Sequence, residues 1–215
     1  MEGSAGRSGQ PEYSEMGDRL RAARRRRHLS LRDLAGRLGL SPSLISQVET
    51  GRAKPSVSTL YAIANELDVS LDELLFNDAA RGSAPPRPQA ALAAAPVQRA
   101  DDRNVIRLAS GVVWERLTTE SVPGIDFLYV TYEVGGASSP EHEFQRHGGH
   151  EWGFVISGTL GVTIGFDDHA LGPGDSISID STMPHRLYNR GTVPVHGIWF
   201  VLGRRSLDVP GLEDA

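Results

Sequence analysis

The chain has 215 residues, a net charge of −5 and no cysteine. Its length is sufficient for two modest hydrophobic cores, and the absence of cysteine excludes disulfides and thiolate catalysis, so any zinc or iron must be held by His, Glu, Asp, Gln or water. No apolar run is long enough to span a bilayer and the first residues lack the apolar core of a secretory signal, so we expect a cytoplasmic protein without a membrane partner.

The amino-terminal part of the chain predicts a tail followed by a helical domain. Residues 1–12 are small and polar, which predicts a flexible tail. Across residues 13–77 the apolar side chains recur at helical spacing, interrupted by serine caps and glycine stops. Five helices are expected: from about Leu20 to His28, after Ser30, after Ser41, from about Val57 to Leu67, and after Ser70.

The rest of the chain changes in composition twice. Residues 78–104 are rich in alanine and proline and have almost no large apolar side chain, which predicts a linker. Residues 105–207 then alternate with a period of two in short segments, with GFDDH and LGPGD expected as turns. This pattern predicts an antiparallel sandwich or barrel with its core at about 127–202. The expected strands are FLYVTYEV, EWGFVISG, LGVTIGF, DSISID and VHGIWFVL.

The second and third expected helices are joined by only three residues, GLS. Two short helices with so tight a turn predict a helix-turn-helix, whose second helix would enter the major groove of DNA. The charge distribution agrees, because the segment from Arg19 to Lys54 has ten basic residues and two acidic ones, whereas the chain from Asn104 onward has seven basic and fourteen acidic ones. Double-stranded DNA is therefore the expected partner of the helical domain.

The run LSLRDLAGRLGLSPSLISQVETGRAKPSVSTLYAIANELDVSLDELL, with its elements LA...LGLS, IS.VE.G and PS..TL, resembles the Cro/repressor-type (XRE) helix-turn-helix family. In that family the third helix meets base edges, which implies a base contact for Gln47, because glutamine pairs bidentately with adenine. The family often has glutamine at the first position of the second helix, and this chain has Leu31 there. The expected DNA-binding residues are Arg32, Pro42, Ser43, Ser46, Gln47, Arg52 and Lys54.

A second set of candidate residues lies in the stretch QRHGGHEWGFVISG. Gln145 and His147 are two apart and would project from the same side of a strand, Glu151 would begin the next strand, and His185 opens a later one. Imidazoles with one carboxylate form a facial set suited to iron, manganese, nickel or zinc. From the residue types alone, the group is either a metal centre or a metal-free polar pocket.

Residues from about 127 to 202 resemble a small cupin barrel, the double-stranded β-helix or jelly-roll fold. The first cupin motif, G-x5-H-x-H-x3-E-x6-G, maps onto this chain with Gln145 in place of its first histidine, and the second motif maps onto His185 and Asn189. The resemblance implies a divalent metal, which would be zinc, iron, manganese or nickel. The implied ligands are Gln145, His147, Glu151 and His185.

The two domains together resemble bacterial XRE regulators with a cupin domain. This resemblance implies a sequence-specific transcriptional regulator, not an enzyme, that binds a two-fold operator as a homodimer and senses a small-molecule effector through the cupin domain. The first alternative is a non-haem Fe(II) cupin oxygenase or epoxidase of the phosphonate-processing type, which shares the domain pair and the His-x3-Glu...His triad. The second alternative is a metal-free barrel that serves only in dimerisation.

Overall fold

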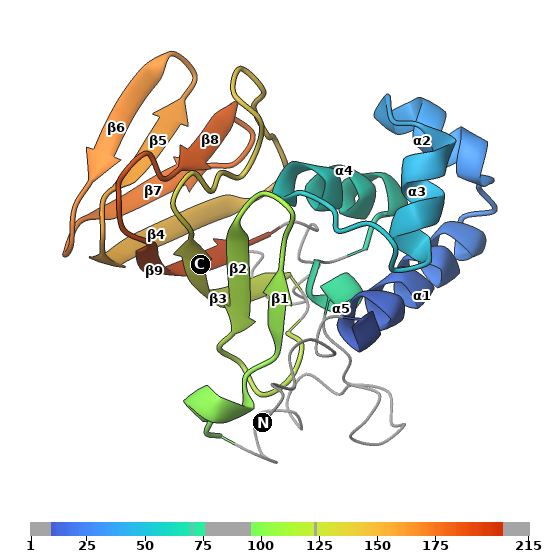
Figure 1. The fold of residues 1–215 in the computed structure, drawn as a ribbon, viewed down its shortest axis with the longest axis horizontal. Helices are drawn as coiled ribbons and strands as arrows, with labels where there is room; N and C mark the ends of the chain where they lie inside the picture. Colours follow the sequence, from blue (N-terminus) through green and yellow to red (C-terminus); the bar gives the residue numbers. More distant parts are fainter. Residues whose placement is uncertain (1–9, 70, 76–95, 123, 204–215) are drawn as a thin grey trace, which may run out of the picture.

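The structure is a computed structural model that describes residues 10–69, 71–75, 96–122 and 124–203 (Figure 1). The helices are α1 (Gln10–Arg26), α2 (Leu31–Leu38), α3 (Pro42–Glu49), α4 (Val57–Leu67) and α5 (Leu71–Leu75), followed by a 3-10 turn at Ala100–Asp102. The strands are β1 (Val105–Arg107), β2 (Val112–Arg116), β3 (Ile125–Tyr132), β4 (His150–Ser157), β5 (Leu160–Ile164), β6 (Asp167–Leu171), β7 (Ser176–Asp180), β8 (His185–Tyr188) and β9 (Val195–Leu202).

Helix α1 begins at Gln10, inside the segment that the sequence predicts as a tail. The remainder of that tail, most of the predicted linker and the Ser70 cap lie outside the described residues. None of the helices in the described ranges is long and apolar enough to cross a membrane.

Short-range capping forms the turn between α2 and α3. Ser30 and Asp33 make a reciprocal capping box, in which each side chain accepts a hydrogen bond from the other residue's backbone N–H. Gly39 ends α2 in the left-handed conformation with φ of 66°, which glycine adopts without steric cost. Ser41 then caps α3, and Pro42 occupies its first turn. The predicted helix-turn-helix is therefore present.

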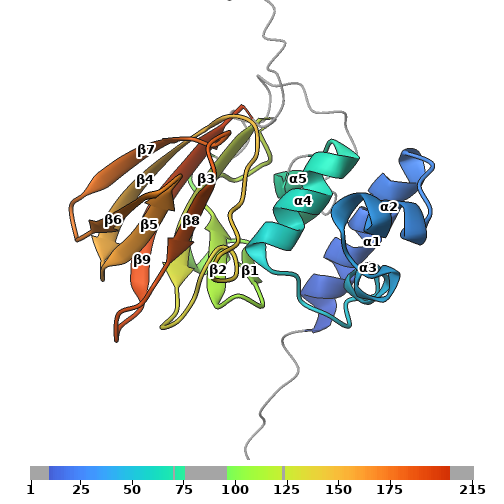
Figure 2. The same ribbon diagram turned by 90° about the horizontal axis from the view of Figure 1, so that it is seen from above.

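The β domain contains a six-stranded sheet in the order β1-β2-β3-β9-β4-β7 and a three-stranded sheet in the order β6-β5-β8. All the strand pairs within both sheets are antiparallel, as predicted. Along β4 the residues alternate strictly, so Glu151, Gly153 and Val155 face the interior, whereas the aromatic residues between them face outward. The sheets lie face to face, and the helices lie beside them at one end (Figures 1 and 2).

The structure corrects the predicted turn at GFDDH. Only Gly165 and Phe166 turn, and Asp167 already begins β6, so His169 lies in a strand opposite Val162. The side chains of β6 are mostly exposed and polar, which removes the alternating pattern from the sequence. Backbone pairing with β5 holds this strand in place. Strands β1 and β2 also lie outside the segments that the sequence pattern indicates.

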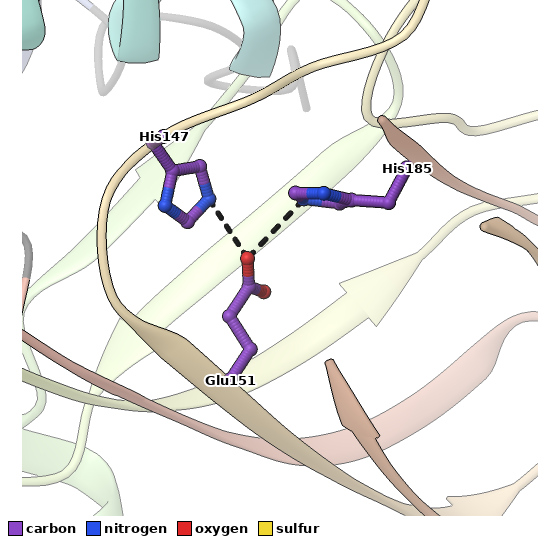
Figure 3. A group of neighbouring side chains, drawn as sticks. All are labelled: His147, Glu151 and His185. Carbon is purple, nitrogen blue, oxygen red and sulfur yellow. Dashed lines mark ion pairs between the residues drawn. The ribbon is translucent and has the colours of Figure 1, made fainter. Parts of the chain in front are cut away.

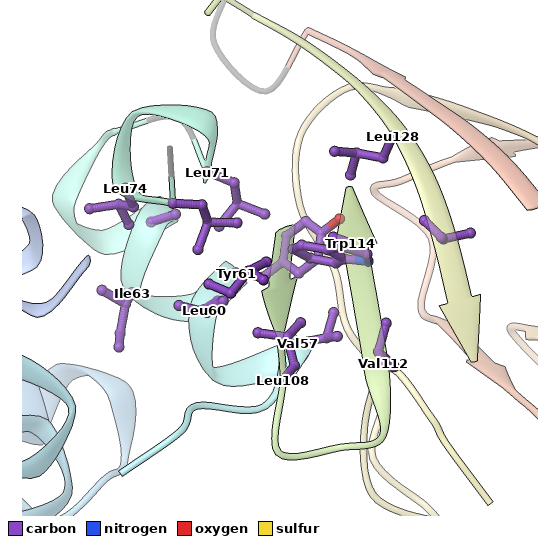
Figure 4. Close-up of a cluster of buried hydrophobic side chains, with 14 of the residues drawn as sticks. Val57, Leu60, Tyr61, Ile63, Leu71, Leu74, Leu108, Val112, Trp114 and Leu128 are labelled. Carbon is purple, nitrogen blue, oxygen red and sulfur yellow. The ribbon is translucent and has the colours of Figure 1, made fainter. Parts of the chain in front are cut away.

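The buried side chains of the helices and of the sheets form one continuous cluster. Helix α4 makes the connection: its Tyr61 meets Trp114 of β2 edge to face, with ring centroids 6.0 Å apart (Figure 4). The backbone joins the domains too, since Ser58 N–H donates to Ser138 O at 3.0 Å and Ala109 N–H donates to Pro55 O at 3.1 Å. The helical domain is thus docked on the β domain through α4.

Candidate functional site

Helix α3 has an exposed polar side. It lies in the helical domain on the side away from the sheets, with α4 between them (Figures 1 and 2). Ile45 and Val48 anchor the opposite side of α3 in the core. Ser43 and Gln47 are exposed, and the Gln47 amide donates to the Ser43 hydroxyl one turn away at 3.3 Å. Exposed amide and hydroxyl groups of this kind can exchange their partners for base edges.

A buried ion pair holds the end of α3. The Arg24 guanidinium of α1 donates to both oxygens of Glu49, at 2.5 and 2.9 Å, and to Leu29 O at 2.7 Å. Both side chains of the pair are buried, and the hydrogen bond with Glu49 raises the pKa of Arg24. This role of Arg24 was not predicted from the sequence, although Arg24 follows Leu20 by four residues and so lies on the core side of its helix.

The basic side chains expected beside α3 remain available. Arg32, Arg52 and Lys54 are all exposed, and neither arginine makes an ion pair with any residue in the described part of the chain. The Lys54 ammonium lies 4.9 Å from the ring centroid of Tyr13. Three other arginines in or beside the helices are paired, as Arg19–Glu15, Arg27–Asp68 and Arg37–Glu66. Arg32 and Arg52 thus differ from these three in having no acidic partner among the described residues.

The β domain brings three of the four predicted metal ligands together, His147, Glu151 and His185, and its backbone pairs the fourth, Gln145, with His185. The backbones of Gln145 and His185 exchange two hydrogen bonds, of 3.0 and 3.1 Å, and His147 N–H donates to Ser181 O at 2.9 Å. Glu151 projects from β4 toward both histidines (Figure 3). The candidate ligand atoms of the two histidines and the glutamate all lie within 4.8 Å of one another. Gln145, His147, Glu151 and His185 are 6%, 5%, 1% and 0% exposed.

The tautomer of each histidine follows from the hydrogen-bond partner of its Nδ1 atom. Nδ1 of His147 lies 3.0 Å from Gly148 O, and Nδ1 of His185 lies 2.9 Å from Met183 O. A carbonyl can only accept, so each Nδ1 must carry the proton. Each Nε2 then faces Oε1 of Glu151, at 2.8 and 3.2 Å. Each of these contacts requires positive charge between nitrogen and oxygen, as a proton or as a metal ion.

Glu151 is held as an anion by its neighbours. Its Oε2 accepts from the Trp199 indole at 2.7 Å and its Oε1 accepts from the Ser181 hydroxyl at 3.0 Å. Burial by itself raises the pKa of Glu151, but the hydrogen bonds and charges of His147 and His185 outweigh it and hold that pKa well below the usual range. Gly153 makes room for the Trp199 ring, which a Cβ at that position would approach to 2.1 Å.

Gln145, which lines the small cavity beside Glu151, is a further indication of whether a metal ion fits this site. Its Oε1 is fully buried and has no hydrogen-bond partner among the described residues. A buried carbonyl oxygen without a donor costs about 1–3 kcal/mol, and a cation beside it would remove that cost. Two imidazoles, a carboxylate and an amide oxygen are a donor set that a divalent ion accepts. The residues present therefore fit a metal ion.

The site is closed by the helical domain. The Tyr61 ring of α4 stacks on the His147 ring, with centroids 4.3 Å apart and planes 10° from parallel. The cavity remaining inside the barrel, beside Glu151, is about 10 Å³, which is room for one water molecule. None of the described residues that line it is basic. An enclosed phosphonate would find no cationic clamp there.

The chain matches the family model described as Helix-turn-helix over residues 20–74 and the model described as Cupin domain over residues 128–201. The HTH-type transcriptional regulator PuuR of Escherichia coli is 30% identical over 175 residues, which cover 80% of this chain and 86% of PuuR. The HTH-type transcriptional regulator DdrOP3 of Deinococcus deserti is 34% identical over 73 residues, which cover 32% of this chain and 57% of DdrOP3.

Two solved structures are similar to this one over most of the chain. The HTH_3 family transcriptional regulator from Vibrio cholerae superimposes with a TM-score of 0.64 and 24% identity, covering 92% of this chain and 100% of that one. It shares the fold of both domains. The hydroxypropylphosphonic acid epoxidase from S. wedmorenis reaches a TM-score of 0.44 and 20% identity, with 90% of this chain and 100% of that one covered.

Proposed function

Because the chain belongs to the HTH-type transcriptional regulators that carry a cupin domain, we propose that it binds a two-fold DNA operator through α3 and responds to the occupancy of its cupin domain. It is a DNA-binding transcriptional regulator rather than an enzyme. The observation that carries the proposal is the exposed polar side of α3, which the buried Arg24–Glu49 pair fixes from behind. Such a regulator would act in the cytoplasm.

The side chains of α3 and its surroundings divide into two kinds of contact. Gln47 would read a base edge in the major groove, with Pro42, Ser43 and Ser46 at the entrance and along the same side. Arg32, Arg52 and Lys54 would contact phosphates, which position the helix without reading sequence. Their exposure supports this assignment, as does the lack of an ion pair between either arginine and any other described residue.

A divalent ion would be held by Gln145, His147, Glu151 and His185. The two Nε2 atoms that face one carboxylate oxygen support this, as does the orphaned amide oxygen of Gln145. The donor set is compatible with zinc, iron, manganese or nickel. When bound, the ion would supply the positive charge between Glu151 and the two imidazoles and would hold these side chains together. Trp199 and Ser181 orient Glu151, and the two backbone carbonyls orient the imidazoles.

A second copy of the chain is the proposed partner of the exposed side of β4. Trp152, Phe154 and Ile156 are 41%, 45% and 43% exposed, and Phe200 of the neighbouring β9 lies beside Trp152. A contiguous apolar surface of this kind marks an interaction site. A two-fold operator needs two copies of α3, which a symmetric contact between two such sheets would provide.

Footprinting on the DNA upstream of its own gene tests this function, with the purified chain in the presence and absence of added divalent metal. We expect a discrete protected region with two-fold symmetry, and a change in the protection when metal is removed. The proposed DNA recognition is contradicted if protection is uniform along the fragment at physiological salt. The proposed metal response is contradicted if a discrete footprint is identical in both conditions.

A further inference from the structure

A cleft lies between the two domains, separate from the interior of the barrel. Its volume is about 310 Å³. The helical domain contributes Leu38, Leu40, Thr59 and Tyr61, and the β domain contributes the loop 143–146. Leu38 and Leu40 flank Gly39, the residue that turns the chain from α2 into α3. A molecule in this cleft would therefore contact the helix-turn-helix and the β domain at the same time.

Tyr61 and Gln145 separate this cleft from the metal centre. They are the two described residues that line both the cleft and the small interior cavity. Because that cavity has room for about one water molecule, an organic ligand cannot enter it in this conformation. The cleft, in contrast, falls at the lower end of the volumes that small-molecule sites have. A small ligand would be held there, against the outer side of the wall made by Tyr61 and Gln145.

The cleft offers one charge of each sign. Arg146 and Glu143 both line it, and neither side chain has an ion pair or a hydrogen bond with any residue in the described ranges. The backbone N–H groups of Ser58 and Thr59, which also line the cleft, are already engaged, since that of Ser58 donates to Ser138 O and that of Thr59 donates to Ser56 Oγ. The groups available for recognition at this cleft are thus a guanidinium and a carboxylate.

We propose that this interdomain cleft binds a small amino-carboxylate, whose carboxylate faces Arg146 and whose ammonium faces Glu143. The proposal rests on the proposed regulatory function, for which it names the effector class and its site. Guanidinium groups bind carboxylates in a bidentate manner, and Glu143 accepts charge-assisted hydrogen bonds from an ammonium. Because the ligand spans both domains, it favours the docked arrangement of α4 and thereby shifts the population of DNA-competent molecules.

Isothermal titration calorimetry of the full chain, loaded with divalent metal and without DNA, tests the site. The probes are the proteinogenic amino acids, followed for each binder by its analogues that lack the amino or the carboxylate group. We expect saturable binding of at least one amino acid and a loss of about tenfold or more for either analogue. Arg146→Gln and Glu143→Gln should each weaken binding by a similar factor.

The matched controls are Arg190→Gln and Glu141→Gln, which remove the same residue types from an exposed ion pair outside the cleft lining. These variants should bind the amino acid as the wild type does. The proposal is overturned if no amino acid binds, or if either cleft variant keeps wild-type affinity. Because the titration contains no DNA, this failure is distinct from a failure of the footprint.

Discussion

Glu49 in the helical domain and Glu151 in the β domain are both buried carboxylates, but they differ in the source of the positive charge that balances them. Glu49 receives two hydrogen bonds from a guanidinium, which carries a full positive charge at every physiological pH. Glu151 faces two imidazoles whose Nδ1 protons are already used. The charge of Glu49 is balanced by an arginine of the same chain, whereas that of Glu151 is balanced only when the site takes up protons or a cation from solvent. The contrast separates a buried charge that holds a helix in place from one that can bind an ion.

The largest expected effect is on folding stability and comes from breaking the buried Arg24–Glu49 pair. Glu49→Gln leaves the Arg24 guanidinium buried without a counter-charge and should destabilise folding by on the order of 3 kcal/mol. Urea unfolding followed by circular dichroism measures the change. Glu66→Gln, which breaks the exposed pair with Arg37, is the control and should cost less than about 1 kcal/mol. Equal stability of the Glu49 variant and the wild type would contradict a stabilising role for the buried pair.

A substitution in the site around Glu151 should affect metal retention instead. His147→Ala removes one of the two imidazoles that face Glu151 and should weaken metal binding by about 100-fold or more, since even groups behind a ligand contribute up to that factor. Equilibrium dialysis against a divalent metal measures it. His150→Ala is the matched control, because His150 is exposed and precedes Glu151 on the other side of β4. The ligand assignment fails if both variants retain metal equally.

A smaller effect is expected at the exposed side of α3, where no buried charge is involved. Gln47→Ala should weaken binding to the operator by about 1–3 kcal/mol and leave nonspecific binding nearly unchanged, because a base contact is lost. Fluorescence anisotropy with specific and scrambled duplexes measures both affinities. Asn65→Ala, an exposed change on α4, should alter neither. Equal losses on the two duplexes would exclude a base-reading role for Gln47.

The smallest effect concerns charge alone. Lys54→Ala should reduce affinity a few-fold on every sequence and lower the slope of log K against log salt by about 1, because one phosphate contact is lost. Anisotropy titrations at several salt concentrations give the slope. An unchanged slope would reject a phosphate contact and would leave the cation–π contact with Tyr13 as the main interaction of Lys54.

The sequence predicts the parts of this molecule that depend on neighbours in the chain. The caps at Ser30 and Ser41, the turn at Gly39 and the alternation of β4 are local signals, and the structure contains all of them. The approach of His147 and Glu151 also follows from local spacing, and a recognised motif adds the distant His185.

The features that sequence analysis missed all depend on packing between distant elements. Stacking of Tyr61 on His147 needs the helical domain to dock on the barrel, and nothing in the spacing of either residue indicates it. Strand β6 is polar because most of its side chains face solvent, so the apolar pattern of the sequence does not predict its pairing with β5. The Arg24–Glu49 pair could have been predicted in part, since helical spacing places both residues on the core side of their helices.

The most direct test of the contrast between the two carboxylates is a calorimetric titration of divalent metal into the chelator-treated, full-length chain. Two buried imidazoles and an orphaned amide oxygen around Glu151 predict saturable binding of one ion per chain, which is lost in Glu151→Gln and kept in Glu49→Gln under conditions where both variants are folded. Heat signals without saturation for zinc, iron, manganese and nickel alike would contradict the account of Glu151 as an ion-binding carboxylate.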